Sequence, residues 1–251
     1  MTARLRAIGP PVVFGIALLV VWEAVVGLAG VPAFLLPAPS AIGAQIGAQF
    51  PVLLSTTAVT GGNALVGLVA GFLLGVLLAL LAAASRLVQE LATPVVLAAS
   101  AVPIVALAPV FTTMFGSATE IPRRLVVTVV VVVPVFVSTA RGLRQVLPVH
   151  AELMSALAAS PWQFARFVRL PGAVPFIMTG LRLAAPAAVI AAIVAEYFGG
   201  LQNGLGSRIT AAAANTAYAR AWAFVAASIA LGLVFYLVGL LAERLATRGR
   251  T

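Results

Sequence analysis

Few side chains in this sequence could carry out chemistry. It contains six glutamates, one histidine and fifteen arginines, but no cysteine, lysine or aspartate. The chain therefore has no thiolate nucleophile, no sulfur metal ligand, no lysine Schiff base and no phosphate-binding loop of the G-x-x-x-x-G-K-[ST] type. His150 has no second imidazole with which to share a metal ion. We predict that the chain is not an enzyme and has no catalytic, cofactor-binding or metal-binding residues, so that any ATP it uses is bound by another chain.

The most informative stretch is a moderately polar segment, ELMSALAASPWQFARFVRLP, at residues 152–171. Alanine, glutamate, leucine and methionine dominate residues 149–159 and favour a helix there. We expect a second short helix to begin after Ser160. Ser160 can cap this helix, Pro161 suits its first position, and Gln163 completes a capping box.

The second short helix would present two kinds of surface. Gln163, Arg166 and Arg169 recur every three residues and share one side. Its apolar surface would come from Trp162, Phe164, Phe167 and Val168. We expect the residues 170–172, Leu-Pro-Gly, to end it. These patterns alone leave open whether the two helices rest on lipid as amphipathic helices or are bound by another protein.

The composition shows which solvent surrounds most of the chain. It is 63% hydrophobic and only 8% charged, and its mean hydropathy is +1.16. A soluble domain has roughly 25% charged residues, so lipid must replace water around most of this one. The net charge of +9 does not indicate nucleic acid, because the arginines lie at the ends of apolar runs, where they meet lipid headgroups.

Six apolar runs are long enough to cross a membrane, which takes about 20 helical residues. They are residues 11–30, 57–84, 91–115, 125–141, 174–196 and 221–242. Pro94, Pro103 and Pro109 interrupt the third run, and Pro186 lies in the fifth. Helical proline is tolerated in lipid where neighbouring helices or a cavity satisfy the freed carbonyls. Whether these prolines line a pathway or are ordinary packing kinks is left open.

We therefore predict one all-α, polytopic membrane domain over residues 1–251, with six transmembrane helices. A helical loop at residues 145–172 would join the fourth and fifth. Gly67, Gly71 and Gly75 share one face of the second helix, and such a face lets another backbone approach closely. We expect them to pack against a helix of this chain or of a second copy.

The arginines predict the orientation. With the N-terminus inside, the cytoplasmic segments hold ten arginines, Arg250 among them, against four outside, which are Arg123, Arg124, Arg208 and Arg220. This excess predicts cytoplasmic N- and C-termini in the inner membrane and places residues 142–173 in the cytoplasm. A cleaved signal peptide is the alternative for the first run, which is longer than a usual signal core because it continues to Gly30.

The loop resembles the EAA loop of the permeases of binding-protein-dependent, type I ABC importers. That pattern is E-A-A, three residues, G, nine residues, I, one residue and L-P. Glu152 stands at the E, Ala158 at the G, Val168 at the I, and Leu170-Pro171 at the L-P. Leucine and methionine replace the two alanines. Because alanine replaces the glycine, we expect a plain helical turn at residue 158 rather than a backbone with positive φ.

Other segments resemble the sulfonate, nitrate and taurine branch of this family. Residues 102–109, VPIVALAP, followed by Phe115-Gly116, are similar to its V-P-x-x-A-x-x-P…F-G segment. Residues 36–40, LPAPS, are similar to the L-P-x-P-S after its first span. The order and spacing hold over about residues 10–245.

The resemblance implies partners and a mechanism. A binding protein outside the membrane delivers a small solute, and two permease copies, identical or related, form the pathway. Two cytoplasmic ATPase subunits bind ATP and Mg²⁺ and dock on the two loops. We expect the apolar side chains of 162–168 to fill a groove on the ATPase, with arginines at its rim. The expected ATPase-coupling residues are Glu152, Ala158, Ser160, Trp162, Phe164, Arg166, Phe167, Val168, Leu170 and Pro171.

The substrate and two rival classes stay open. Sulfonates, taurine, nitrate and vitamin precursors such as thiamine pyrimidines or riboflavin fit this branch equally. A stand-alone secondary transporter or channel usually needs ionisable residues inside the membrane, and only Glu23, Arg182 and Glu196 come near. A membrane scaffold protein would leave the helical loop without a purpose. The candidates for lining a pathway are Pro103, Pro109, Arg182, Pro186 and Glu196.

Overall fold

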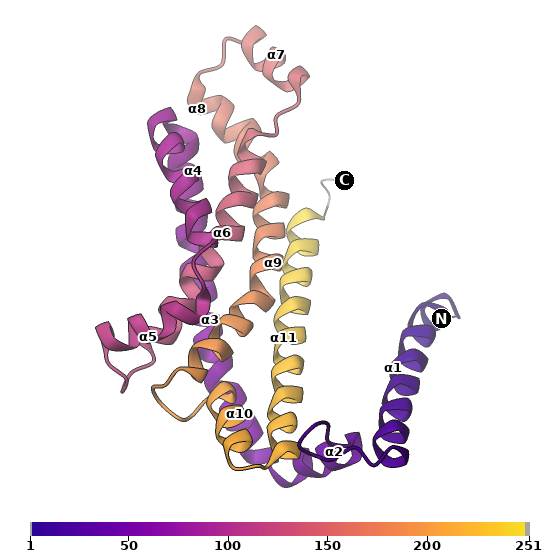
Figure 1. Cartoon of the computed structure of the whole chain (residues 1–251). Coiled ribbons are helices and arrows are strands. Elements are labelled where there is room, and N and C mark those ends of the chain that lie inside the picture. The colour runs from indigo at the N-terminus through magenta and orange to yellow at the C-terminus, as the bar shows by residue number, and fades with distance from the viewer. Residues whose placement is uncertain (1, 249–251) are drawn as a thin grey trace.

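The computed structural model of the protein describes residues 2–248, apart from the side chains of 2–8, 86, 92, 93, 97 and 100. Arg250, which the arginine count includes, lies outside the described residues. All regular structure in the described part is helical (Figure 1). The elements are α1 (Thr2–Leu28), α2 (Pro39–Ala48), α3 (Phe50–Ala84), α4 (Arg86–Ser100), α5 (Ile104–Phe115), α6 (Ile121–Arg144), α7 (Pro148–Ala156), α8 (Pro161–Phe164), the π-helical η1 (Ala165–Arg169), α9 (Leu170–Tyr197), α10 (Leu205–Ala214) and α11 (Tyr218–Thr247).

Five helical stretches among the described residues are long and apolar enough to cross a membrane. They are Gly9–Leu28, Phe50–Ala84, Ile121–Arg144, Pro161–Tyr197 and Tyr218–Thr247. A helix satisfies all of its backbone groups internally, which is why a chain this apolar folds into helices in lipid. The predicted all-α, polytopic membrane bundle is confirmed.

The run predicted as a third span, 91–115, forms two shorter helices instead of one. Helix α4 ends at Ser100 and α5 begins at Ile104, on the far side of a short non-helical turn. Pro103 has no N–H and disfavours helical geometry in the residue before it, so the helix breaks there. Figure 1 shows α5 running at a wide angle to α4. The other two prolines of the run lie inside the helices, Pro94 in α4 and Pro109 in α5.

Helix α6 lies between α3 and α9 and forms the centre of the bundle with them. Its valines 126, 127, 131 and 135 are completely buried. They contact small residues of α9, among which Ala184, Ala188 and Ala192 are also fully buried. Lipid tails are as apolar as these side chains, so close van der Waals packing rather than the hydrophobic effect holds such helices together.

The glycine face of α3 makes the α3–α6 contact possible. A Cβ atom on Gly71 would lie 2.7 Å from the backbone oxygen of Thr128 and 2.7 Å from Cβ of Val131. A Cβ atom on Gly75 would lie 2.9 Å from Cβ of Val135, and Gly67 faces Val127 in the same way. The predicted packing role of these glycines is confirmed, and their partner is a helix of the same chain.

Helix α1 stands apart from the bundle over most of its length (Figure 1), and near its C-terminal end the Trp22 ring lies 5.6 Å from that of Trp222 in α11. Glu23 joins it to α2, because its carboxylate accepts hydrogen bonds from the backbone N–H of Ser40 at 2.9 Å and from the Ser40 hydroxyl at 2.6 Å. Ser40 lies in the first turn of α2, where backbone N–H groups have no partner within the helix. Glu23 therefore has a structural partner.

Filling the glycine face should disrupt the bundle. Replacing Gly71 with valine would drive two methyl groups into α6 and should lower the free energy of unfolding by about 1–3 kcal/mol or abolish folding. Gly62→Val is the matched control, since a Cβ atom there meets nothing within 4 Å. Thermal unfolding of both variants in detergent measures the difference. Equal melting temperatures would contradict the packing role.

Candidate functional site

The candidate site is the connecting segment, defined as residues 145–172, which links α6 to α9. It contains α7, α8 and η1. Figure 1 shows α7 and α8 projecting beyond the ends of the bundle helices. A segment in this position is accessible to another protein at the end of the bundle.

Helix α7 ends in a Schellman motif centred on Ala158. The N–H of Ala159 donates to the carbonyl of Met154 at 3.0 Å, and the N–H of Ala158 donates to the carbonyl of Ser155 at 3.0 Å. This motif needs a left-handed residue at its centre, and Ala158 has φ 51°. The predicted plain helical turn at residue 158 is therefore wrong. The two hydrogen bonds that close α7 hold alanine in a conformation that costs an L-residue about 1–2 kcal/mol.

The predicted capping box at the start of α8 is confirmed. The N–H of Gln163 donates to the Ser160 hydroxyl at 3.3 Å, and the N–H of Ser160 donates to the Gln163 side-chain oxygen at 2.7 Å. Pro161 occupies the first helical turn, where the missing N–H costs nothing. The Gln163 side chain is therefore used in the cap. It is not available to form a polar face together with Arg166 and Arg169.

The predicted end of this helix at residues 170–172 is wrong. Helix α8 passes directly into η1 and then into α9, so that Pro161–Tyr197 is one helical stretch of 37 residues. Pro171 falls in the first turn of α9, just after the π-helical turn, where a proline does not end a helix. Single π-helical turns are rare and often lie at functional sites.

The connecting segment exposes large apolar side chains, two of them at the start of the apolar helical stretch Pro161–Tyr197. Trp162 is 66% exposed and Phe167 is 65% exposed. Other residues of the segment that are more than half exposed are Leu147, Val149, Leu153 and Leu157. We call these six residues the apolar face of the segment. An exposed apolar face of this kind suits contact either with a protein partner or with a membrane surface.

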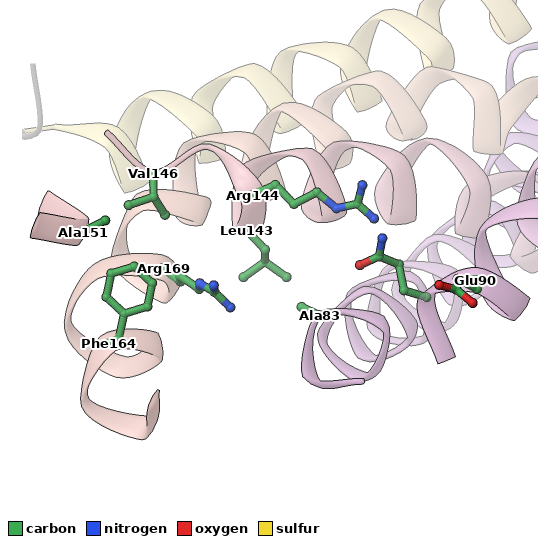
Figure 2. A pocket seen from close by; sticks show the side chains of 9 residues that line it. Ala83, Glu90, Leu143, Arg144, Val146, Ala151, Phe164 and Arg169 are labelled. Atoms are coloured by element: carbon green, nitrogen blue, oxygen red, sulfur yellow. The ribbon is translucent and has the colours of Figure 1, made fainter. Parts of the chain in front are cut away.

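The other expected coupling residues lie elsewhere in the segment. Phe164 turns inward, where the Arg169 guanidinium lies 4.9 Å from its ring centroid (Figure 2). Val168 and Pro171 line a cavity of about 430 Å³ beneath α7. Arg166 and Glu152 are exposed, and Arg166 lies 5.9 Å from the ring centroid of Phe167.

Among the pathway candidates, Glu196 is almost completely buried, at 1% exposure. Its carboxylate accepts hydrogen bonds from the Thr60 hydroxyl at 2.9 Å and from the Gly206 N–H at 2.7 Å. The Leu205 N–H donates to the Thr60 hydroxyl at 2.9 Å. Glu196 and Thr60 therefore satisfy the first backbone donors of α10, which begins at Leu205. This geometry is that of a helix cap that joins α9, α3 and α10.

The remaining pathway candidates have separate environments. Arg182 forms an ion pair with Glu243 of α11 at 2.8 Å, and the Thr179 hydroxyl donates to the same carboxylate at 2.6 Å. Pro186 lines an apolar groove of about 430 Å³ between α9, α10 and α11. Pro103 and Pro109 are exposed.

Sequence reasoning missed a polar cluster at the start of α6. Arg123, which the arginine count places in an outer loop, is only 2% exposed. Its guanidinium donates to Glu120 and to the side-chain oxygen of Asn203, both at 2.8 Å, and also to the carbonyl of Leu201. Burial raises the pKa of Glu120, but hydrogen bonds from Asn203 and Asn63 and the Arg123 charge hold it below its usual value. The adjacent arginines and the polar Asn63 within an apolar run were the available signals.

Within the described residues, no group of three or more His, Cys, Asp or Glu side chains could hold a metal ion.

Residues 71–250 match the family described as binding-protein-dependent transport system inner membrane component. The chain belongs to this family. The matched range includes the whole connecting segment and the helices on both sides of it. The family consists of transport permease subunits, so the chain is a multi-pass inner-membrane transport protein rather than an enzyme.

Several curated permeases are similar to this chain. A probable ABC transporter permease of Haemophilus influenzae is 32% identical over 204 residues, which cover 81% of this chain and 82% of the relative. The formylaminopyrimidine transport permease ThiX of Halalkalibacterium halodurans is 33% identical and covers 78% of each chain. The riboflavin transport permease RibX of Chloroflexus aurantiacus is 30% identical and covers 96% of this chain and 90% of the relative.

The predicted family and branch are confirmed. A putative aliphatic sulfonate permease of Bacillus subtilis also matches, at 28% identity over 198 residues. The methionine ABC transporter MetNI in an inward-facing conformation has a similar fold, with a TM-score of 0.68 at 18% identity, covering 80% of this chain and 98% of that one.

Relieving the left-handed alanine should stabilise the connecting segment. Ala158→Gly removes the steric penalty and should raise the free energy of local opening at the end of α7 by about 1 kcal/mol. Amide hydrogen exchange there should slow accordingly. Ala156→Gly, inside α7, is the control and should speed exchange by a similar amount, because glycine disfavours helix. A faster exchange in both variants would contradict the strain at residue 158.

Removing the Glu196 carboxylate should destabilise the packing of α10 against α9 and α3. Glu196→Gln replaces one acceptor oxygen by an NH₂ group facing other donors, and the loss should be about 1–3 kcal/mol of stability. Thermal unfolding in detergent measures this loss. Glu152→Gln, at an exposed carboxylate, serves as the control and should leave the melting temperature unchanged. An unchanged melting temperature in Glu196→Gln would exclude the capping role.

Proposed function

We propose that this protein is the permease subunit of an ABC importer for a small solute, and that a separate ATPase docks on its connecting segment. In this proposal two permease subunits, identical or related, form the pathway, and a binding protein delivers the solute from outside. ATP and Mg²⁺ are bound by the ATPase. The chain's family membership supports this assembly in general terms.

The observation that carries the proposal is the unbroken helical stretch Pro161–Tyr197. It begins within the apolar face of the connecting segment and runs through the centre of the bundle. At a rise of 1.5 Å per residue it is roughly 55 Å long, so it can carry a displacement across the membrane. A flexible linker at residues 170–172 would lose that displacement.

The local geometry of the segment also suits a part that bears force. The Schellman motif closes α7, and the capping box fixes the start of α8. In our proposal, closure of two ATPase subunits draws two connecting segments together, and α9 transmits the motion to α3 and α6, which opens the pathway outward. ATP hydrolysis then resets the arrangement.

The apolar face provides the contact. Trp162 and Phe167 are the aromatic residues of this face, and buried aromatic side chains dominate the energy of many protein interfaces. We propose that they fill a groove on the ATPase and that Arg166 lies at its rim. This arrangement requires the connecting segment, and with it both termini, to be cytoplasmic.

The relatives supply candidate solutes. Their names include formylaminopyrimidine, riboflavin and aliphatic sulfonates. We propose that the cargo is a vitamin precursor of these kinds, a sulfonate, taurine or nitrate, with selection resting largely on the binding protein. Uptake assays with each partner binding protein in proteoliposomes would identify it.

Truncating the apolar face should uncouple the ATPase. Trp162→Ala combined with Phe167→Ala should reduce co-purification of the ATPase by at least about tenfold, because two buried aromatic anchors are each worth about 2 kcal/mol or more. ATP-dependent uptake should fall in parallel.

The control for this test is Leu77→Ala, which truncates an exposed apolar residue within the long apolar stretch of α3. It should leave both measurements unchanged. Retention of the ATPase and of uptake by the double variant would exclude docking at the apolar face. Uptake without any ATPase would instead favour a stand-alone transporter.

A further inference from the structure

A second cavity lies between the connecting segment and the bundle. Its volume is about 650 Å³. Four parts of the chain contribute to its wall: the α3–α4 junction, the end of α6, α7, and the α8–η1 turn (Figure 2). The lining residues are Ala83, Gln89, Glu90, Leu143, Arg144, Val146, Ala151, Phe164 and Arg169.

Two guanidinium groups make the lining of this cavity positively charged. Arg144 comes from the last turn of α6 and Arg169 from η1, and both line the cavity (Figure 2). Neither forms an ion pair in the part of the chain that the structure describes. The Nε atom of Arg169 is buried and has no hydrogen-bond partner. Against these two cations stands one acid, Glu90, so the lining has a net positive charge.

The cavity holds one of these cations in place before any ligand arrives. The Phe164 ring lies 4.9 Å from the Arg169 guanidinium and limits its freedom. A buried guanidinium nitrogen without a partner is costly unless something accepts a hydrogen bond from it. Arginine pairs well with phosphate, because its planar donors match the phosphate oxygens.

The surroundings of the cavity point to lipid. It lies where the apolar helix α3 ends and where α6 ends in arginine, which is the pattern expected at a bilayer interface. Leu87 and Leu91, in the first turns of α4, are 67% and 61% exposed. Acyl chains can lie along these leucines while the headgroup enters the cavity.

We propose that this cavity binds the phosphodiester headgroup of an anionic membrane phospholipid through Arg144 and Arg169. The bound headgroup would hold the connecting segment to α4 and α6, because residues of all three line the cavity. The inference does not depend on the docking of an ATPase, since it concerns a ligand of the isolated subunit.

The test uses the full chain in detergent and measures lipid binding by native mass spectrometry and by the shift in melting temperature. The probes are dioleoylphosphatidylglycerol, dioleoylphosphatidylcholine and inorganic phosphate. Phosphatidylglycerol should bind and stabilise the protein more than phosphatidylcholine with the same acyl chains. Arg144→Gln should weaken phosphatidylglycerol binding by about tenfold, because a charge-assisted hydrogen bond is worth about 1.5–3 kcal/mol.

Two further variants separate binding in the cavity from general effects of charge and folding. Arg141→Gln removes an exposed arginine from the same last turn of α6 and should leave the affinity unchanged. Glu90→Gln removes the acid of the cavity and should raise the affinity severalfold, which no loss of folding can imitate.

Three outcomes would overturn the proposal. The first is an equal loss of affinity in Arg141→Gln and Arg144→Gln, which would show only a general surface charge effect. The second is equal binding of the two lipids. The third is stabilisation by inorganic phosphate without stabilisation by phosphatidylglycerol, which would assign the cavity to a free anion.

Discussion

The close approach of α3 and α6 is the contact on which the rest of the structure depends. Three glycines of α3 lie against three fully buried valines of α6, and the alanines of α9 pack on the opposite side. In lipid, such packing replaces the hydrophobic effect as the main source of helix association. Because the three helices approach so closely, a displacement of α9 cannot be absorbed by loose side chains and must be shared with α6 and α3.

Helix α9 joins the two polar regions of the molecule through this packed centre. At one end the helical stretch begins at Pro161, within the apolar face of the connecting segment. At the other end Glu196 caps α10 and binds Thr60 of α3. One continuous helical stretch thus connects a surface suited to a protein partner with a hydrogen-bonded junction of three helices. This arrangement favours transmission of force over local rearrangement.

Local patterns in the sequence predicted the features that depend on a few neighbouring residues. The Ser160–Gln163 capping box and the long apolar helices are of this kind, and so is the glycine face. The features that sequence reasoning missed depend on backbone geometry or on contacts that residue types do not reveal. Ala158 is left-handed because the end of α7 closes around it, and the helix continues past Pro171 because a π-helical turn precedes it. The burial of Arg123 depends on Asn203, which is distant in sequence.

The ionisable residues inside the apolar helices help to distinguish a stand-alone transporter from one that is driven by a partner protein. A stand-alone transporter needs such groups free to exchange ions or protons. Here Glu23 accepts two hydrogen bonds from Ser40, Arg182 pairs with Glu243, and Glu196 caps α10. Each group has a structural partner, so charge movement within the membrane would have to break these contacts. The connecting segment has an exposed apolar face and continues directly into α9, so we propose that it is the part of the described chain that receives energy from a partner.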